Sequence, residues 1–197
     1  MDDEDERPRR PRNAVTTRAA ILDAARVAFT DMGYASAGVR DIAAVAGVNA
    51  ALVIRYFGSK EGLFAASVAE GFEIGDLLAG DRATFGERLA WYLFLKEQGG
   101  GFDPLLMLCS ASNAHAAPLL REALDTQFVR PLAAWLGGKD ATVRAGLIAA
   151  YLTGLSVLRG VLRSESLATA EGETFVALVA PVLQAYADGV PVRTRSG

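Results

Sequence analysis

Apolar residues recur along this chain at intervals of three and four, the period of an α-helix that packs on one side. The first stripe, in a helix predicted from Thr16 or Thr17 to about Met32, is made of Ile21, Leu22, Ala25, Ala28, Phe29 and Met32. Further stripes predict helices over 59–79, 85–98, 104–111, 116–135, 140–163 and 172–187, and Pro131 is expected to kink or divide the helix over 116–135. No segment alternates with period two for long enough to indicate a strand, so the predicted fold class is all-α.

The segment 38–60 predicts two short helices joined by a tight turn, followed by the start of a third. Gly47 is placed where the first helix must end, because glycine adopts the left-handed conformation without steric cost. Asn49 is a good N-cap for the second helix, whose buried side is predicted to hold Val53 and Phe57. This order is the plan of a helix-turn-helix, whose second helix lies in the DNA major groove.

Several short motifs follow one another across the first third of the chain. They are Gly33-Tyr34, Val39-Arg40-Asp41-Ile42-Ala43, Ala46-Gly47-Val48, Tyr56-Phe57-Gly58-Ser59-Lys60-Glu61 and Leu63-Phe64. Each motif is weak alone, but together and in this order they are specific, and they resemble the TetR/AcrR family of bacterial transcriptional regulators. The resemblance implies an N-terminal three-helix helix-turn-helix DNA-binding domain, a C-terminal helical ligand-binding and dimerisation domain, and a repressor.

One position departs from the pattern of that family, which usually has Ser or Thr immediately before Val39. This chain has Gly38 there, which is tolerable as a helix cap but offers no hydroxyl to a phosphate. Arg55 is the candidate for reading guanine, with a phosphate contact as the alternative, whereas Leu52 and Ile54 offer only apolar contact, for example to a thymine methyl. The full set of candidate DNA-binding residues is Thr17, Arg40, Asn49, Ala50, Ala51, Leu52, Arg55, Tyr56 and Lys60.

Four segments are expected along the chain. Residues 1–14 are predicted to be a disordered arm in which an acidic stretch precedes a basic, proline-rich one. The arm either reaches phosphates or a minor groove, or it is a solubilising tail, and both interpretations stay open. Residues 15–60 are predicted to form the DNA-binding domain, 61–190 the ligand-binding and dimerisation domain, and 191–197 a flexible tail.

Large apolar side chains in the second half of the chain favour an apolar or aromatic ligand. The candidate pocket residues are Phe72, Trp91, Tyr92, Phe94, Phe102, Met107, Leu108 and Phe128. The same residues serve equally well as packed core, so the pattern does not separate the two roles, and it does not identify the effector.

Residues 140–163 carry two apolar stripes, so this helix is expected to be buried on two sides, one of them against a second copy of the chain. Paired with the last helix across a two-fold axis, it would form a four-helix bundle, as the resemblance implies for dimers of the family. A fully internal helix in a monomer is the alternative. The candidate dimer interface consists of Leu147, Tyr151, Gly154, Leu158, Val161, Val179, Leu183 and Tyr186.

The chain of 197 residues has a net charge of −3, but its positive charge is concentrated in the proposed DNA-binding region. Residues 7–60 hold 9 Lys and Arg against 3 Asp and Glu, whereas residues 61–197 hold 11 against 15. This local excess fits a surface that meets phosphate groups.

Little in the composition indicates catalysis or a bound metal. His115 is the only histidine and Cys109 the only cysteine, which leaves no histidine cluster for a metal and no internal disulfide. A Cys109–His115 nucleophile and base would lack a nearby acidic residue to orient it. We therefore expect no enzyme activity, no cofactor and no metal.

No apolar run at the N-terminus suggests a signal peptide, and a single cysteine fits a reducing compartment. The apolar stretch 145–158, bounded by Arg144 and Arg159, is expected to be too short to cross a bilayer. The predicted location is the cytoplasm, with no membrane partner.

Two functions follow from these observations. The first is a homodimeric repressor that binds double-stranded DNA at a pseudo-palindromic operator and is released by an unidentified small molecule. The second is a ligand-binding or interaction module of the same fold with weak or lost sequence-specific DNA binding. Arg55, Tyr56 and Lys60 favour DNA binding, with much of the affinity from phosphate contacts, because few other polar side chains are available for base edges.

Overall fold

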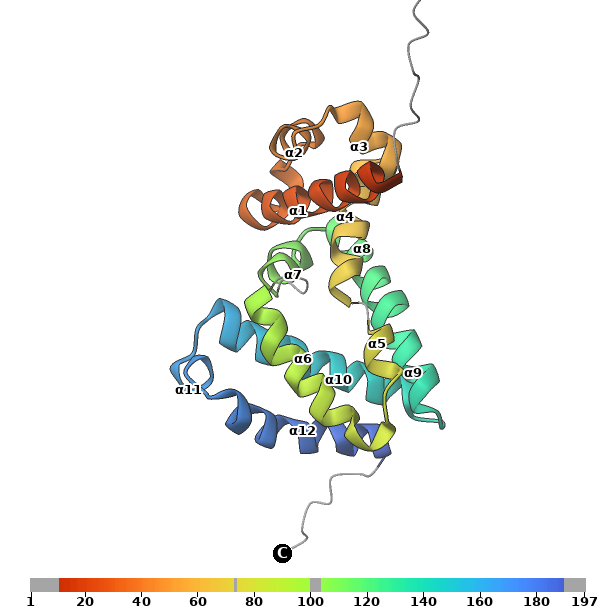
Figure 1. Cartoon of the computed structure of the whole chain (residues 1–197), viewed down its shortest axis with the longest axis vertical. Helices are drawn as coiled ribbons and strands as arrows, with labels where there is room; N and C mark the ends of the chain where they lie inside the picture. The colour runs from red at the N-terminus through yellow and green to blue at the C-terminus, as the bar shows by residue number, and fades with distance from the viewer. Residues whose placement is uncertain (1–10, 73, 100–103, 190–197) are drawn as a thin grey trace, which may run out of the picture. The chain divides into compact units, whose positions relative to one another are not determined.

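The computed structural model describes residues 11–72, 74–99 and 104–189, and every regular element among them is helical, which confirms the all-α prediction (Figure 1). The chain divides into two compact units, 1–67 and 68–197. The boundary lies within the helix α4 (Lys60–Ala69) rather than before it. The predicted tail, 191–197, and most of the predicted arm lie outside the described residues.

The first unit is built from α1 (Pro11–Ser36), α2 (Val39–Val45), α3 (Ala50–Phe57) and most of α4. Since α1 begins at Pro11, the last residues of the predicted arm are helical, and its ladder is interrupted at Gly33, where φ is 73°. The predicted stripe faces inward, except that Met32 is 45% exposed. Its fully buried members are Ile21, Leu22, Ala25 and Phe29.

Three aromatic rings join α1 to α4 in the core of the first unit. The ring of Phe64 meets Phe29 edge-on at 5.2 Å and Tyr34 edge-on at 5.1 Å, and Phe29 stacks with Tyr34 at 5.9 Å between centroids. These separations are those at which aromatic pairs attract one another. Leu63 beside them is fully buried, so the start of α4 is part of the first unit's core.

The second unit consists of twelve short and long helical elements in the described residues. They are η1 (Glu70–Phe72), α5 (Gly75–Leu78), η2 (Arg82–Thr84), α6 (Phe85–Gly99), α7 (Pro104–Ala111), α8 (Ala116–Leu124), η3 (Asp125–Val129), α9 (Arg130–Leu136), α10 (Ala141–Ser156), η4 (Val157–Val161), α11 (Glu165–Ala168) and α12 (Gly172–Asp188). Along its length α12 packs against α6 (Figure 1).

Two of the predicted long helices are divided in the structure. The prediction of a single helix over 59–79 is wrong, because α4 ends at Ala69 and α5 begins only at Gly75. Gly71 and Gly75 fall in this interval, and each glycine weakens a helix by about 1 kcal/mol. The helix predicted over 116–135 is split by η3, a π-helical turn that immediately precedes the turn containing Pro131, whose missing N–H breaks the regular ladder.

Two arginines close the ends of helices in the second unit. The guanidinium of Arg82 donates to the carbonyls of Trp135, Leu136 and Ala187 at 3.0, 2.9 and 2.7 Å. Arg144 donates to the carbonyls of Tyr186 and Ala187 at 2.8 and 3.3 Å. Carbonyls in the last turn of a helix lack intrahelical partners and carry partial negative charge, so these cations satisfy the C-terminal ends of α9 and α12.

The helix formed by α10 and η4 lies within the predicted range 140–163, but its apolar part extends beyond the predicted apolar stretch 145–158. Ala141–Val161 spans 21 residues with a mean hydropathy of 1.5 over its most apolar window, of which 28% is buried. The prediction that this stretch is too short to cross a bilayer is therefore wrong as a statement of length. Length and composition alone are weak indications of a membrane span, because core helices meet the same criteria.

Candidate nucleic-acid interface and ligand cavity

A tight turn joins α2 to α3 in the first unit. Gly47 adopts a φ of 67°, and the N–H of Val48 donates to the carbonyl of Ala43 at 2.9 Å. The side-chain oxygen of Asn49 accepts the N–H of Leu52 at 2.8 Å, which confirms Asn49 as the N-cap of α3. The left-handed glycine and the cap together fix the direction in which α3 leaves the turn.

The helix α3 buries one side and exposes the other. Val53 is fully buried, whereas Ile54 is 42% exposed and Arg55 and Ala51 are exposed. Phe57, predicted to be buried, is half-buried, and the guanidinium of Arg18 lies 5.4 Å from the centre of its ring. The outward surface of α3 thus brings together the candidate DNA-binding residues Asn49, Ala50, Ala51, Leu52, Arg55 and Tyr56.

The other candidate DNA-binding residues come from three neighbouring helices. Arg40 is exposed on α2, Thr17 is half-buried on α1, and Lys60 is the first residue of α4. The ammonium of Lys60 donates to the carbonyl of Ala35 at 3.2 Å and lies 4.8 Å from the ring centre of Tyr34. An ammonium has three donors, so a phosphate contact remains open to it.

A polar cluster beside Lys60 ties α1 to α4. The hydroxyl of Tyr34 donates to the carboxylate of Glu61 at 3.1 Å, and the hydroxyl of Ser59 accepts the N–H of Gly62 at 3.1 Å. Backbone N–H donation, the Ser59 hydroxyl and the Tyr34 hydroxyl lower the pKa of Glu61. Burial, followed by the hydrogen bond to Glu61 and then by the Glu61 charge, raises the pKa of Tyr34. Sequence reasoning missed the Tyr34–Glu61 pair, because its residues are 27 positions apart.

The N-terminus of α2 has Gly38 as its cap, with no side-chain hydrogen bond. A Cβ added to Gly38 would lie 2.5 Å from a carboxylate oxygen of Asp41, so this carboxylate occupies the space of a capping side chain. A carboxylate at a helix N-terminus is favourable to the helix but repels a phosphate. We therefore still expect the hydroxyl–phosphate contact to be missing at Gly38, and the Asp41 carboxylate gives a physical reason for it.

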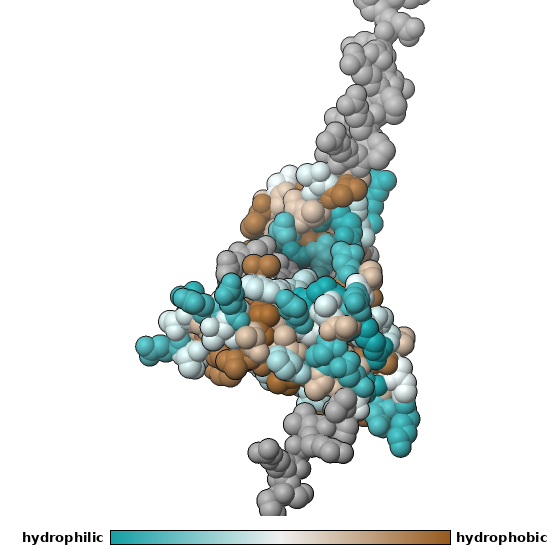
Figure 2. All heavy atoms as spheres, turned by 60° about the horizontal axis from the view of Figure 1, so that its bottom comes forward, coloured by the Kyte–Doolittle hydropathy of each residue, from teal (hydrophilic) through white to brown (hydrophobic). Residues whose placement is uncertain are grey.

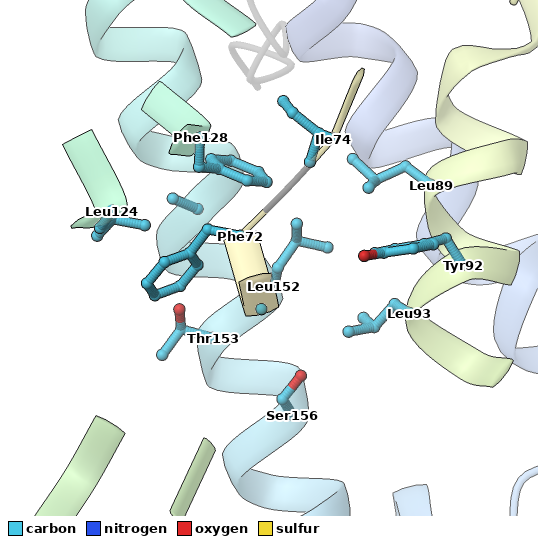
Figure 3. Close-up of a pocket in the computed structure, with 12 residues that line it drawn as sticks. Phe72, Ile74, Leu89, Tyr92, Leu93, Leu124, Phe128, Leu152, Thr153 and Ser156 are labelled. Atoms are coloured by element: carbon cyan, nitrogen blue, oxygen red, sulfur yellow. The ribbon is translucent and has the colours of Figure 1, made fainter. Parts of the chain in front are cut away.

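The second unit contains an apolar cavity between α6, α10, the end of α8 and η1 (Figure 3). The volume of this cavity is about 40 Å³. A drug-sized ligand occupies several hundred Å³, so side chains would have to move to admit one. The lining residues are Gly71, Phe72, Ile74, Leu89, Tyr92, Leu93, Leu124, Phe128, Ala149, Leu152, Thr153 and Ser156.

Three predicted pocket residues, Phe72, Tyr92 and Phe128, line this cavity (Figure 3). Trp91 and Phe94 lie elsewhere, in an aromatic cluster with Phe175, where the rings of Phe94 and Phe175 are 5.6 Å apart. Met107, which is half-buried on α7, and Leu108, which is 46% exposed there, do not line it either. The last candidate, Phe102, lies outside the described residues.

Sequence reasoning missed nine of the lining residues, and four of these come from one face of α10. Ala149, Leu152, Thr153 and Ser156 follow one another at intervals of three, one and three. This helical spacing was the available signal, since it places them on a common face. The pocket prediction considered only large side chains and therefore did not use this spacing.

The outward surfaces of α10 and α12 carry large apolar side chains. Leu147 on α10 is 44% exposed, Leu158 on η4, which continues α10, is 43% exposed, and Leu178 on α12 is 71% exposed. Tyr151 and Tyr186 lie close enough for Tyr186 to raise the pKa of Tyr151, second to the effect of burial. Figure 2, which brings the α12 side forward, shows hydrophobic atoms gathered on this face.

Two predicted interface residues are not on this surface. Val179 and Leu183 are 5% and 0% exposed, because that side of α12 packs against α6 within one chain. The neighbouring Leu178 is exposed on this surface instead. The other predicted residues keep some exposure: Gly154 is exposed, and Tyr151, Val161 and Tyr186 are half-buried.

The two residues considered for catalysis are both exposed: Cys109 lies on α7, and His115 immediately precedes α8. In the part of the chain that the structure describes, no group of three or more His, Cys, Asp or Glu is placed to hold a metal ion.

The first unit has a capped second helix that faces outward after a glycine turn, and the second unit is helical and contains a cavity. This combination is typical of helix-turn-helix regulators with a separate effector unit. Comparison with known proteins gives the family. The family model described as "Bacterial regulatory proteins, tetR family" matches residues 21–67, and that described as "Tetracyclin repressor-like, C-terminal domain" matches residues 83–187.

Individual relatives agree with these matches. The HTH-type transcriptional regulatory protein RaaS of Mycobacterium tuberculosis is 32% identical over 150 residues, which are 68% of this chain and 67% of that protein. A TetR-family regulator from Streptomyces coelicolor A3 is 30% identical with a TM-score of 0.61, over 92% of this chain and 99% of its own. FadR from Bacillus subtilis, solved with stearoyl-CoA, is 19% identical with a TM-score of 0.60 over 88% and 99%, and it shares the fold.

The chain therefore belongs to the TetR family: it is a transcriptional regulator with a DNA-binding helix-turn-helix and a C-terminal ligand-binding domain of the family's type.

Proposed function

We propose that this protein is a cytoplasmic, homodimeric repressor that leaves its operator when a small apolar or aromatic molecule enters the cavity of the second unit. The observation that carries the DNA-binding part is the division of α3, which buries Val53 and turns Arg55 and its neighbours outward. A helix held in this way at the end of a glycine turn is presented as a reading helix for the major groove.

The polar and charged residues around α3 divide between two kinds of contact. Lys60 and the hydroxyl of Tyr56 are proposed to contact phosphates, and the fork of Arg55 is proposed to read guanine O6 and N7. Ala51 and Ile54, both exposed, add apolar contact to thymine methyl groups.

The exposed apolar surface of α10 and α12 supports the proposal of a homodimer. Leu158 and Leu178 are large, apolar and substantially exposed, as expected of a face that a second copy covers. We propose that a second copy of the chain, rather than a membrane, covers the long apolar helix Ala141–Val161, because Arg144 and Arg159 place charges within its length.

Release is proposed to start at Phe72, which lines the cavity and follows the end of α4 by three residues. The start of α4 belongs to the core of the first unit through Leu63 and Phe64. A ligand that displaces Phe72 would therefore move α4 and change the spacing of the two reading helices in the dimer. The ligand must bind the two spacings with different affinity, because equal affinity would shift nothing.

The experiment compares Lys60→Ala with Lys139→Ala, an exposed lysine in the loop before α10. Affinity for double-stranded DNA is measured against salt concentration for both variants and the unmodified protein. Loss of one phosphate contact per chain should lower the slope of log affinity against log salt by about 0.9 for each Lys60 removed, and Lys139→Ala should leave it unchanged. If Lys60→Ala folds normally and keeps the full slope, Lys60 is not in the interface.

A further inference from the structure

The cavity of the second unit is lined without a single charged residue. Its twelve lining residues are apolar apart from the hydroxyl groups of Tyr92, Thr153 and Ser156, together with backbone groups. An ionised group enclosed here would lose its hydration and gain no counter-charge, which is a large penalty for a buried charge. The lining therefore selects against ligands that carry a carboxylate, a phosphate or an ammonium at the enclosed end.

One of the three hydroxyl groups is in an unusual state. Ser156 is fully buried, and its Oγ has no hydrogen-bond partner among the described residues. A buried hydroxyl normally bonds to a neighbouring carbonyl or side chain, and leaving it unpaired costs stability. Figure 3 shows its oxygen directed toward the side chains of Leu93 and Leu152, on the cavity side of α10.

The backbone around this hydroxyl is also irregular. Ser156 is the residue from which the π-helical turn η4 begins, and Phe128, on the opposite wall of the cavity, lies in the π-helical turn η3. π-helical turns are uncommon and occur frequently at functional sites. One such turn contributes the Phe128 side chain to the cavity wall and the other follows directly after Ser156, which indicates that the walls are shaped for a purpose other than close packing.

We infer that Ser156 is the polar anchor of the cavity, and that the ligand is an uncharged, largely apolar molecule whose hydroxyl or carbonyl group hydrogen-bonds to the Ser156 Oγ. This inference rests on the proposed function for the identity of the cavity as the effector site. It adds the ligand's charge, its polarity and the residue that recognises its polar group. Tyr92 and Thr153 place two further hydroxyl groups on the cavity walls (Figure 3).

The test uses four probes that share one phenylbutyl body and differ in its terminal group: butylbenzene, 4-phenylbutan-1-ol, 5-phenylpentanoate and 4-phenylbutylammonium. Their affinities are measured by calorimetry for the full chain, for Ser156→Ala and for Ser110→Ala. Ser110 is the matched control, because it is also fully buried with an unpartnered Oγ but does not line the cavity.

The expected result is a coupling between the probe's hydroxyl and Ser156. Ser156→Ala should weaken binding of the alcohol about 5- to 10-fold and leave butylbenzene unchanged, as the loss of one hydrogen bond predicts. The two ionised probes should bind at least about 10-fold more weakly than the alcohol. Neither serine variant should lower the thermal unfolding midpoint without ligand, because each removes an unpaired buried hydroxyl, and Ser110→Ala should bind all probes as the unmodified protein does.

Three results would overturn the inference: equal weakening of alcohol and hydrocarbon by Ser156→Ala, tightest binding by an ionised probe, or no binding of the alcohol up to its solubility limit. DNA release separates this inference from the proposed function. An alcohol that couples to Ser156 but leaves DNA bound supports the anchor and contradicts the effector role. An ionised compound that binds in the cavity and releases DNA contradicts the proposed anchor and supports the effector role.

Discussion

Replacing Gly62 by alanine tests how the reading helix is held in place. Gly62 lies in the first turn of α4, and a Cβ added there would collide with the backbone carbonyl oxygen of Phe57, the last residue of α3. That oxygen also accepts the N–H of Ser59 at 2.9 Å, so it cannot turn aside without losing this bond. The closeness of α3 to α4 thus depends on the absence of a side chain at Gly62.

Two opposing contributions decide the magnitude. Alanine favours a helix over glycine by up to about 1 kcal/mol, and less in the first turn. Forcing a methyl group against an immobile backbone atom costs about 1–3 kcal/mol. The expected net effect of Gly62→Ala is a loss of about 1–2 kcal/mol, together with weaker DNA binding because the end of α3 is displaced.

The assay is urea unfolding followed by circular dichroism, with Gly146→Ala as the matched control. Gly146 lies within α10, and a Cβ there would meet nothing within 4 Å, so this variant should be more stable by up to about 1 kcal/mol. Hydrogen exchange should locate the loss in Gly62→Ala to the amides of α3 and α4. If Gly62→Ala unfolds at the same or a higher urea concentration than the unmodified protein, the argument from close approach is refuted.

Four further predictions follow from the remaining features. Leu158→Glu should convert a dimer to monomers in analytical ultracentrifugation, and an unchanged mass would remove this face from the interface. Folding lowers the pKa of Glu61, so its carboxylate stabilises the fold at pH values above the pKa of the unfolded chain, and this stability is lost as pH falls through the folded pKa. Glu61→Gln should therefore make the unfolding midpoint depend less on pH in the acid range. Arg82→Ala should cost about 1–3 kcal/mol in chemical unfolding, since the carbonyls of Trp135 and Leu136 lose this donor and that of Ala187 keeps only Arg144, whereas an unaffected midpoint would show that solvent replaces it. Phe72→Ala should raise the concentration of effector needed to release DNA while leaving DNA affinity without effector nearly unchanged; release at the same concentration would exclude Phe72 from the coupling.

The first unit was predictable from sequence because its signals are local. A left-handed glycine, an N-cap and a buried valine each act within a few residues, and Gly47, Asn49 and Val53 behave as their types predict. The Tyr34–Glu61 bond was not predictable in this way, since it depends on how α1 and α4 pack.

The second unit was harder to predict because its helices are apolar on more than one side. Val179 and Leu178 are neighbours of similar hydrophobicity, yet one is 5% exposed and the other 71% exposed. Only the packing of α12 against α6 decides which of the two faces inward. For the same reason Phe72 and Phe94 looked alike as pocket candidates, although only Phe72 lines the cavity.

Selection of binding sites from a pool of random double-stranded DNA tests the central claim most directly. A dimer whose two α3 helices enter successive major grooves should enrich an inverted repeat with half-site centres about 34–36 Å apart, one helical turn. Arg55→Ala should relax the preference at one base pair in each half-site if Arg55 reads guanine. Enrichment of no sequence at all, or of single half-sites without a symmetric partner, would contradict a sequence-specific dimeric regulator.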